Sequence, residues 1–278
     1  MSTHGICLFE YGYFGDNLEG MRIVVCVKHV PDVQAERTLE SGYLVRGDDD
    51  VLNELDENAV QEAVNLADGD GEVIVITMGP EDAVDGLRRA LALGADSAIH
   101  VCDERAAGSD VLGTARVLSA TIDRLQQDGP IDLVVTGMAA LDGMTATIPS
   151  ALAAHLDLPA LTMAKKVELD GRTIRVHRTM GTYDEVLEAD LPAILSVTDQ
   201  ANEIMYPNFR AIMAAKKKPI TELNLDDLGL AGEQVGTAGA ATKVNAAEQR
   251  PPREAGEIVQ DAGDAGTQLA NYILGVMK

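Results

Sequence analysis

The sequence predicts an α/β protein with a doubly wound, mostly parallel sheet. In residues 21–200, short solid runs of aliphatic residues alternate with segments whose apolar residues recur at helical spacing. Solid runs are typical of strands buried on both faces, and short connections favour parallel strands joined by crossover helices. The 278 residues suit one large domain or one large and one small, and only 3% are aromatic, so we expect an aliphatic core.

The buried strands are expected in five places. The first follows Met21, where a basic residue precedes a solid apolar run, as is usual for the central strand of a parallel sheet. The predicted strands cover residues 22–28, 72–79, 97–103, 131–138 and 192–199.

Helices are expected between these strands. In residues 55–68 one helical face carries only apolar side chains, namely Leu55, Ala59, Val60, Ala63, Val64 and Ala67. The other helices are predicted over residues 80–93, 110–127 and 145–156.

The alternation changes after Pro159. The Asp170-Gly171 pair is a strong hairpin signal, and residues 183–189 alternate like a third antiparallel strand, so residues 164–189 are predicted to form a small antiparallel flap. Residues 201–230 contain a short helix, a basic run and an extended segment.

Both ends of the chain are expected to differ from the domain. Residues 1–20 are predicted to be a disordered extension, and residues 231–265, rich in Gly, Ala, Glu and Pro, a flexible linker. Residues 266–278 place Leu269, Ile273, Val276 and Met277 at helical spacing, which predicts a C-terminal arm that packs on the body or on a partner.

The net charge of −23 and pI of about 4.4 argue against nucleic acid and anionic membranes as partners. A salt-rich cytosol explains acids spread along the chain better than steering of a basic partner does. Cys7, Cys26 and Cys102 lack metal-ligand spacing, so neither a metal site nor a disulfide is expected. With no apolar run long enough to span a bilayer and no signal-peptide pattern, we expect a cytoplasmic protein without membrane insertion.

The candidate ligand site lies where the predicted strands end, because doubly wound sheets bind ligands beyond the carboxyl ends of their strands. A helix starting near Met144 would offer free N–H groups to a phosphate, with Asp142 and Thr145 as caps; the alternative is that Asp142-Gly143 is only a turn. Glycines 79 and 137 would let a ligand approach closely. The candidates are Val27, Lys28, Thr77, Met78, Gly79, Gly137, Asp142, Gly143, Met144, Thr145 and Ala146.

No catalytic machinery is predicted, since nothing pairs a nucleophile with a base. Lys28-His29 is a weak candidate for a catalytic pair, while His100 and His155 fit core or boundary positions. The basic run at residues 214–219 is a weak nucleic-acid signal and better suits a loop anchor or a contact with an acidic partner.

Five segments, in order, resemble the electron transfer flavoprotein beta subunit family over about residues 21–230. The family opens with "KI-x-V-x-VK-x-VPD", continues with a helix start at an Asn, here Asn53, and later has "R-x-AL-x-(M/L)-GAD", "G-x-x-A-x-D" and "IM-x-AKKK" blocks. The matching segments are "MRIVVCVKHVPD" (21–32), "LNELDENAVQEAVNL" (52–66), "VITMGPEDAVDGLRRALALGAD" (75–96), "VVTGMAALDGMTATIPSALAAHLDLP" (134–159) and "LPAILSVTDQANEIMYPNFRAIMAAKKKPI" (191–220).

The resemblance implies an adenine-nucleotide α-hydrolase-like fold and an electron carrier with no substrate of its own. It implies a heterodimer with an alpha subunit, FAD at their interface, electrons from donor dehydrogenases and delivery to a quinone oxidoreductase. The beta subunit would bind a second nucleotide at the strand ends, with Asn53 among the cofactor-binding residues. That nucleotide is AMP in the common type and a second FAD in the electron-bifurcating type.

One segment discriminates the two types. The AMP type has Asp-Asp-Asp-x-Asn-Gln-Thr and the second-FAD type has Asp-Gly-Asp-Thr-Ala-Gln-Val. Gly143, Thr145 and Ala146 follow the second-FAD type, which we favour, whereas Met144 and Thr147 fit neither and leave AMP open.

The docking loop departs from the family pattern, in which a Leu precedes Asn-Glu-Pro. Here the positions are Ala201, Asn202, Glu203 and Ile204. An interface anchor truncated to Ala typically loses more than ~1 kcal/mol, so we expect a donor other than the usual acyl-CoA dehydrogenases.

Two other functions fit the same fold. An ATP-cleaving adenylating enzyme needs a phosphate-gripping loop after the first strand, where this chain has "KHVPD" (28–32). A nucleotide-binding stress or signalling module would need neither the flap nor the terminal helix.

Overall fold

The computed structural model describes residues 20–277, apart from a few positions within that range. Those positions are Glu36, Ser41, Asp48, Pro252, Glu254, Ala255 and Glu257. The predicted extension at residues 1–20 and Cys7 therefore lie, apart from Gly20, outside the described residues.

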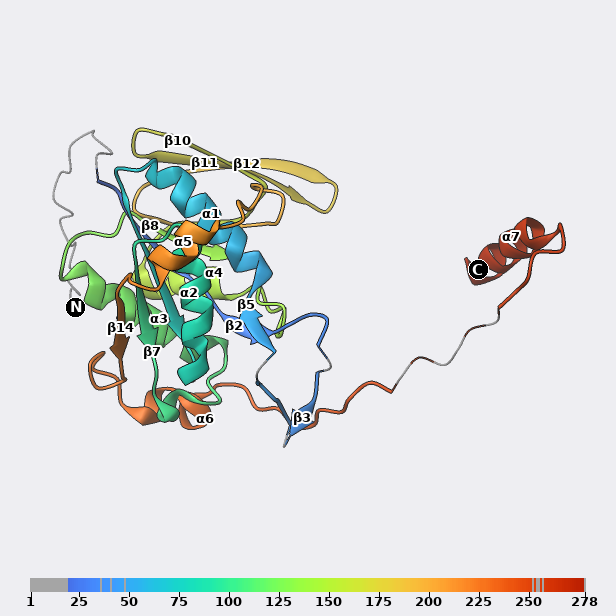
Figure 1. The fold of residues 1–278 in the computed structure, drawn as a ribbon, viewed down its shortest axis with the longest axis horizontal. Coiled ribbons are helices and arrows are strands. Elements are labelled where there is room, and N and C mark those ends of the chain that lie inside the picture. Colours follow the sequence, from blue (N-terminus) through green and yellow to red (C-terminus); the bar gives the residue numbers. More distant parts are fainter. Residues whose placement is uncertain are drawn as a thin grey trace, which may run out of the picture.

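Seven parallel strands form the central sheet, in the order β14-β7-β6-β1-β8-β13-β9 (Figure 1). Every strand predicted from a solid apolar run is present, and the α/β doubly wound prediction is confirmed. Two short edge strands, β9 and β14, had no such run to mark them. The strands are β1 Arg22–Cys26, β6 Glu72–Met78, β7 Ser97–Val101, β8 Leu133–Gly137, β9 Ala160–Ala164, β13 Ala193–Val197 and β14 Ile220–Leu223.

Helices cover both faces of this sheet. On one face α1 (Glu54–Ala67) and α2 (Val84–Leu93) pack on β1, β6 and β8, while on the other α3 (Val111–Gln126) and α4 (Ile148–Leu156) pack on β6 and β13. Strand β1 alternates between the two cores: Ile23 and Val25 face α1, and Val24 and Cys26 face α3 and α4. All four side chains are buried, which explains the uninterrupted apolar run.

Helix α4 begins three residues later than its apolar pattern indicates. Met144 and Ala146 have positive φ angles of 48° and 51°, which a right-handed helix does not accommodate. Pro149 then lies in the first turn, where its fixed φ and missing N–H are tolerated.

The flap forms as predicted, as a separate antiparallel sheet of β10 (Lys166–Asp170), β11 (Thr173–Met180) and β12 (Tyr183–Asp190). Asp170 pairs with Thr173 across the turn, and Gly171 adopts the positive φ of 54° that this turn requires. Ile174 and Val176 of β11 are buried in the core that also holds α1.

Between β1 and α1 the chain forms two short ribbons that the sequence pattern did not indicate. Strand β2 (His29–Pro31) pairs with β5 (Asp50–Leu52), and β3 (Leu39–Glu40) pairs with β4 (Tyr43–Leu44). The β2–β5 ribbon packs beside α2, and the loop before β5 carries Arg46.

The segment after β13 returns across the body. Helix α5 (Phe209–Ala215) packs on α2, and β14 adds to the sheet edge.

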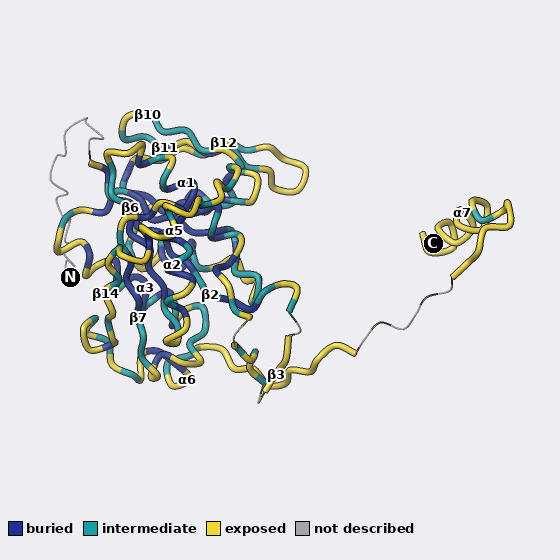
Figure 2. Tube along the Cα trace, in the orientation of Figure 1, coloured by how far each residue is buried: buried dark blue, intermediate teal, exposed yellow. Residues whose placement is uncertain are grey.

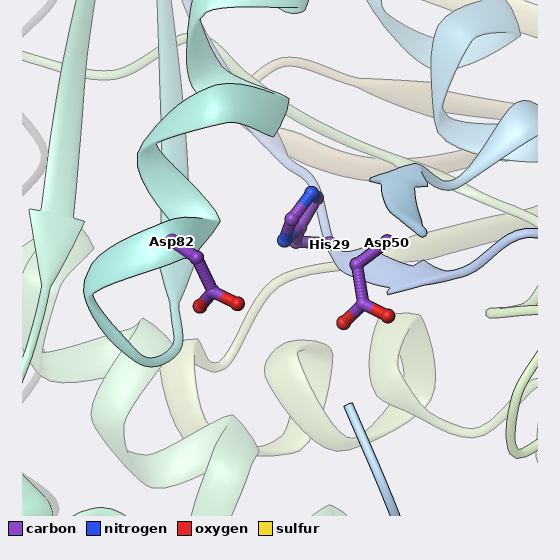
Figure 3. Close-up of side chains that lie close together, drawn as sticks. All are labelled: His29, Asp50 and Asp82. Carbon is purple, nitrogen blue, oxygen red and sulfur yellow. The ribbon is translucent and has the colours of Figure 1, made fainter. Parts of the chain in front are cut away.

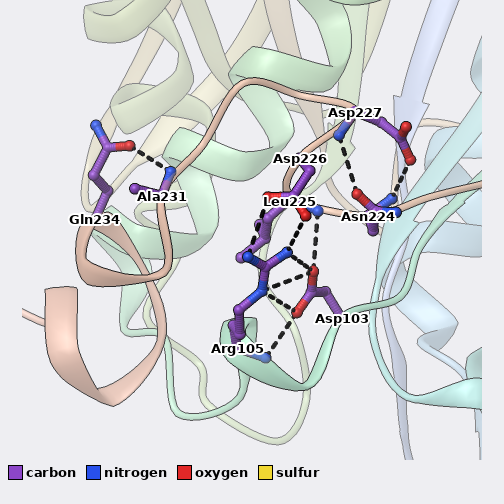
Figure 4. Close-up of polar contacts among 8 residues, drawn as sticks. All are labelled: Asp103, Arg105, Asn224, Leu225, Asp226, Asp227, Ala231 and Gln234. Atoms are coloured by element: carbon purple, nitrogen blue, oxygen red, sulfur yellow. Dashed lines mark hydrogen bonds and ion pairs between the residues drawn. The ribbon is translucent and has the colours of Figure 1, made fainter.

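Asp103, after β7, accepts hydrogen bonds from Arg105 and from the Leu225 N–H, as Figure 4 shows. The hydrogen bonds from Arg105 hold the pKa of Asp103 well below its usual range.

The predicted flexible linker does not begin at residue 231. The 3-10 helix η3 (Gly232–Gln234) and the short α6 (Gly236–Gly239) lie on the body, and Val235 between them is fully buried. Beyond them the chain leads away to α7 (Ala265–Val276), which has no buried residue and stands apart from the body (Figures 1 and 2). No helix in the described part of the chain is long and apolar enough to cross a membrane.

Candidate functional site

The strand order reverses at β1. The chain runs from β1 to β6 and β7 on one side, and then places β8 on the other side of β1. In doubly wound sheets ligands bind at such a switch point, outside the carboxyl ends of the strands. Val27 and Lys28 follow β1, Gly137 ends β8, and Thr77 and Met78 end β6, so the structure brings these predicted residues to one edge.

The centre of this edge is the buried carboxylate of Asp56, in the first turn of α1. It accepts the Lys28 N–H at 2.8 Å and also bonds Asn53 and the Gly137 N–H, so it joins α1 to the ends of β1 and β8. Burial raises its pKa to about 7 against the opposing effect of these bonds and of the Lys28 charge. We did not predict Asp56, because an acid in the first turn of a helix is usually a solvent-exposed end group.

Asn53, just before α1, holds the loop that follows β8. Its side chain donates to Ala139 O at 2.9 Å and accepts the Leu141 N–H at 3.1 Å, and it is fully buried. With both ends of its amide occupied inside the protein, Asn53 holds this loop in place.

Asp142 does not cap the helix as expected. Its carboxylate lies 2.8 Å from Lys28 Nζ and pairs with Arg46 from the loop before β5. Burial alone would raise the pKa of Asp142, but the charges and hydrogen bonds of Lys28 and Arg46 outweigh it and lower the pKa. The loop thus has two cations beside it, although its own sequence contains none; Arg46 was missed because no local pattern links it to the site.

Residues 145–147 form a row of free backbone donors, after Met144, whose N–H donates to the Ala140 carbonyl at 2.8 Å. Met144 and Ala146 have positive φ angles, and Thr147 adopts the right-handed helical conformation. An alternation of left-handed and right-handed conformations points successive N–H groups to one side of the chain. Within the described chain, the N–H groups of Thr145, Ala146 and Thr147 have no hydrogen-bond acceptor, and all three residues are exposed. The first turn of α4 adds unpaired N–H groups beside them.

The glycines at this edge have different roles from those expected. A Cβ at Gly137 would lie 2.5 Å from Asp56 Oδ1, and one at Gly79 would lie 2.8 Å from the Ala83 Cβ, so these two glycines permit close packing within the protein. Gly143 alone faces open space. Thr77 is also internal, because its hydroxyl donates to Val27 O at 2.8 Å.

The predicted docking residues lie along α1. The Asn58 side chain donates to Asn202 Oδ1, and the Asn202 side chain donates to the Asn58 carbonyl and to Glu62 Oε2, the latter at 2.7 Å. The Met205 N–H donates to Gln61 Oε1. Burial raises the pKa of Glu62, partly offset by the Asn202 bond. Ala201 and Ile204 pack against the core, while Glu203 is exposed.

The docking segment continues into exposed apolar side chains that we did not predict. Met205, Tyr206 and Phe209 are 68%, 86% and 77% exposed. The Tyr206 ring centroid lies 6.0 Å from the Arg89 guanidinium. Large apolar groups exposed next to one another often mark contact surfaces.

Other predicted residues have structural or surface positions. His100 is buried and donates its Nε2–H to the carbonyls of Gly79 and Pro80, as expected of a core residue, whereas His155 is exposed. In the basic run, Lys218 donates to the Ala95 carbonyl beyond the end of α2, which confirms a loop anchor.

Comparison with known proteins gives consistent results. The family model described as "Electron transfer flavoprotein domain" matches residues 42–228. The chain is 39% identical over 261 residues to the electron transfer flavoprotein subunit beta of Mycobacterium tuberculosis (strain ATCC 25618 / H37Rv), covering 91% of this chain and 97% of that protein. It is 35% identical to the subunit of the same name from Clostridium acetobutylicum and 34% identical to the caffeyl-CoA reductase-Etf complex subunit CarD of Acetobacterium woodii, each time covering 93% of this chain and 98% of the relative.

Proposed function

This chain belongs to the electron transfer flavoprotein family as a beta subunit, and on that premise we propose that it carries electrons in a heterodimer. In this proposal an alpha subunit shares an FAD with it at their interface. Donor dehydrogenases supply the electrons, and a quinone oxidoreductase accepts them.

The second element of the proposal is a nucleotide bound in this subunit at the switch point. The observation that supports it is the row of free N–H groups at residues 145–147, because partial positive charges converging on one point suit a phosphate. Lys28, whose side chain is 44% exposed, adds a full positive charge at the same edge. Asn53 and Asp56 hold this edge in place from beneath.

We further propose that this nucleotide is a second FAD, with AMP as the alternative. Gly143, Thr145 and Ala146, which follow the second-FAD pattern, support this choice. Met144 is 56% exposed where both family types carry an acid, and the loss of that negative charge strengthens the binding of either anionic nucleotide. A bound flavin would supply one- and two-electron transfer, while the protein positions it and excludes water.

The partners would bind at two surfaces. Met205, Tyr206 and Phe209 suit the donor dehydrogenase, since Ala201 lacks the anchoring side chain of the family loop. Helix α7 suits the alpha subunit, because its Leu269 and Ile273 are exposed and nothing in the described body covers them.

The adenylating-enzyme alternative finds no support at β1. The residues after β1 pair as β2 with β5, so this segment is an antiparallel ribbon with Pro31 in it. A loop that grips phosphates needs its N–H groups turned toward the ligand, and Pro lacks one.

Co-expression with the alpha subunit and analysis of the extracted nucleotides test the proposal. Two flavins per heterodimer support the second FAD, and one flavin with AMP supports the common type. Absence of flavin from a stable heterodimer contradicts the carrier function.

Gly143→Phe tests the site itself, because open space surrounds Gly143 and the side chain would enter the region of the ligand. We expect the variant to keep the interface flavin and lose the nucleotide in this subunit. Gly256→Phe is the matched control, as Gly256 is equally open but lies in the linker. Unchanged nucleotide content in Gly143→Phe contradicts the site.

A further inference from the structure

A second group of polar side chains lies at the β2–β5 ribbon. It comprises His29 of β2, Asp50 of β5 and Asp82 of the 3-10 helix η1 (Glu81–Ala83), as Figure 3 shows. One ring nitrogen of His29 and one carboxylate oxygen from each Asp all lie within 4.8 Å of one another. The residues come from three separate elements, so the fold and not local sequence brings them together.

The imidazole of His29 has no partner inside the protein. The residue is half-buried, but its Nε2 atom is fully buried and makes no hydrogen bond. Neither ring nitrogen bonds to any described residue. Buried side-chain nitrogens are hydrogen-bonded in the large majority of cases, so an unpartnered imidazole between two carboxylates points to a missing ligand.

The charge around His29 favours a cation. A cavity of about 620 Å³ beside it is lined by Asp32, Asp50, Glu54, Glu57 and Asp85. The arginine in that lining, Arg89, already pairs with Glu57 at 2.6 Å. Arg46 lies 3.8 Å from Asp50, but it also pairs with Asp142, so the negative charge of the cluster is not balanced within the described residues.

We propose that His29, Asp50 and Asp82 bind one divalent transition-metal ion, of the zinc type. Mixed nitrogen and carboxylate ligands suit Zn²⁺ and its neighbours, whereas Mg²⁺ and Ca²⁺ prefer oxygen alone. Zinc bonds of about 2.0–2.2 Å place ligand atoms roughly 3.3 Å apart, so the longest separation in the cluster must shorten by up to about 1.5 Å. Asp82 can supply this movement, because it is exposed and makes no hydrogen bond through its side chain within the described chain.

Such an ion would connect three elements. It would join β2, β5 and η1, and so fix the ribbon whose loop carries Arg46. Drawing Asp50 toward the metal leaves Asp142 as the ionic partner of Arg46. The metal site is independent of the electron-carrier proposal, since none of its ligands belongs to the nucleotide loop.

The test is titration of the purified, chelator-treated full chain, without a histidine tag, with Zn²⁺ and in parallel with Co²⁺. The buffer contains about 1 M KCl, which reduces the Debye length to about 3 Å and suppresses diffuse binding to surface acids. Calorimetry gives the stoichiometry, and visible Co²⁺ absorption reports nitrogen and oxygen ligation.

The variants are His29→Gln, Asp82→Asn and Asp85→Asn. Asp82→Asn guards against misfolding because it changes an exposed residue. Asp85→Asn is the matched control, because it removes the same charge from the lining of the cavity beside His29, outside the cluster. We expect one ion per chain, affinity reduced in the first two variants by more than the roughly 10–100-fold that outer-shell changes cause, and little change in Asp85→Asn. Absence of stoichiometric binding in the wild type, or equal losses in Asp82→Asn and Asp85→Asn, overturns the proposal.

Discussion

Two segments lie against helix α1 and are held in different ways. The loop at residues 139–142 is fixed at the start of α1 by Asn53 and by the ion pairs of Asp142. The segment at residues 202–205 is fixed further along α1 by Asn58, Gln61 and Glu62. The first segment is held by one amide and two ion pairs, and the second by two amides and one carboxylate.

The comparison explains why α1 buries so many polar residues. Its apolar side, with Ala59, Val60 and Ala63, packs on the sheet as predicted, while Asp56, Asn58, Gln61 and Glu62 are buried under the two segments. Each polar side chain has partners there, as burial demands. Helix α1 therefore positions the loop at residues 139–142 with one set of residues and the segment at residues 202–205 with another.

A large expected effect concerns pH and the buried carboxylate of Asp56, in the first turn of α1. Asp56 has a pKa of about 7 in the folded protein, against about 3.9 in an unfolded chain. The folded state thus binds this proton more tightly, so the stabilisation is fully present below about pH 4 and is lost as pH rises through 7. Three pKa units correspond to at most about 4 kcal/mol.

Urea unfolding between pH 5 and 8 measures this difference. We expect the wild type to lose stability over that range and Asp56→Asn to lose much less. Asp142→Asn is the control. Because the pKa of Asp142 is lowered, its ionised carboxylate stabilises the fold above about pH 4, and this stabilisation is lost only in acid. The free energy of unfolding of Asp142→Asn should therefore change with pH between 5 and 8 as it does in the wild type. Equal slopes in wild type and Asp56→Asn contradict the expectation.

Two alanine variants separate the segments. Asn53→Ala leaves the Ala139 carbonyl and the Leu141 N–H without partners, at about 1–3 kcal/mol each. Asn58→Ala removes bonds to a half-buried segment and should cost about 1–2 kcal/mol. Hydrogen exchange should speed up at residues 139–142 in the first variant and at 202–206 in the second; faster exchange of both segments in either variant would show that they are not independent.

Tyr206→Ala should affect docking more than folding. Its ring is 86% exposed, and its contact with Arg89 is worth about 0.5–1 kcal/mol at such a site. We expect stability to change by no more than that, while the KM for reduction of the heterodimer by its donor rises by roughly fivefold or more. Tyr183→Ala, on the flap and 73% exposed, is the matched control; an equal rise in that variant argues against a specific docking surface.

The smallest expected effect on stability comes from removing α7. Deletion of residues 265–278 should leave the free energy of unfolding of the body unchanged within about 0.5 kcal/mol, because no residue of α7 is buried. Binding to the alpha subunit should weaken strongly, which size-exclusion chromatography of co-expressed subunits measures. Replacing the exposed polar residues Gln268 and Asn271 by Ala should leave assembly intact, whereas Leu269→Glu with Ile273→Glu should disrupt it.

Prediction from sequence succeeded where the signal is local and repeated. The runs at β1, β6 and β8 are apolar on both faces, and Asp170-Gly171 marks a turn by itself. Prediction failed where an element or a role depends on tertiary contacts. Strands β9 and β14 lie at the sheet edges and have no solid apolar run, and no periodic pattern in the sequence marks Arg46, Asp56 or the polar side of α1. The start of α4 was placed too early because apolar spacing does not reveal positive φ angles.

The sequence by itself determined the doubly wound architecture, the flap and the family resemblance, because apolar periodicity and turn chemistry are properties of neighbouring residues. The edge at which a ligand binds stays a prediction. The tertiary structure alone decided that Lys28 and Arg46 meet Asp142, that Asp56 joins two strand ends to α1, and that His29 lies between Asp50 and Asp82. These residues are far apart along the chain. Their charges, burial and pKa values depend on distances that exist only once the sheet has formed.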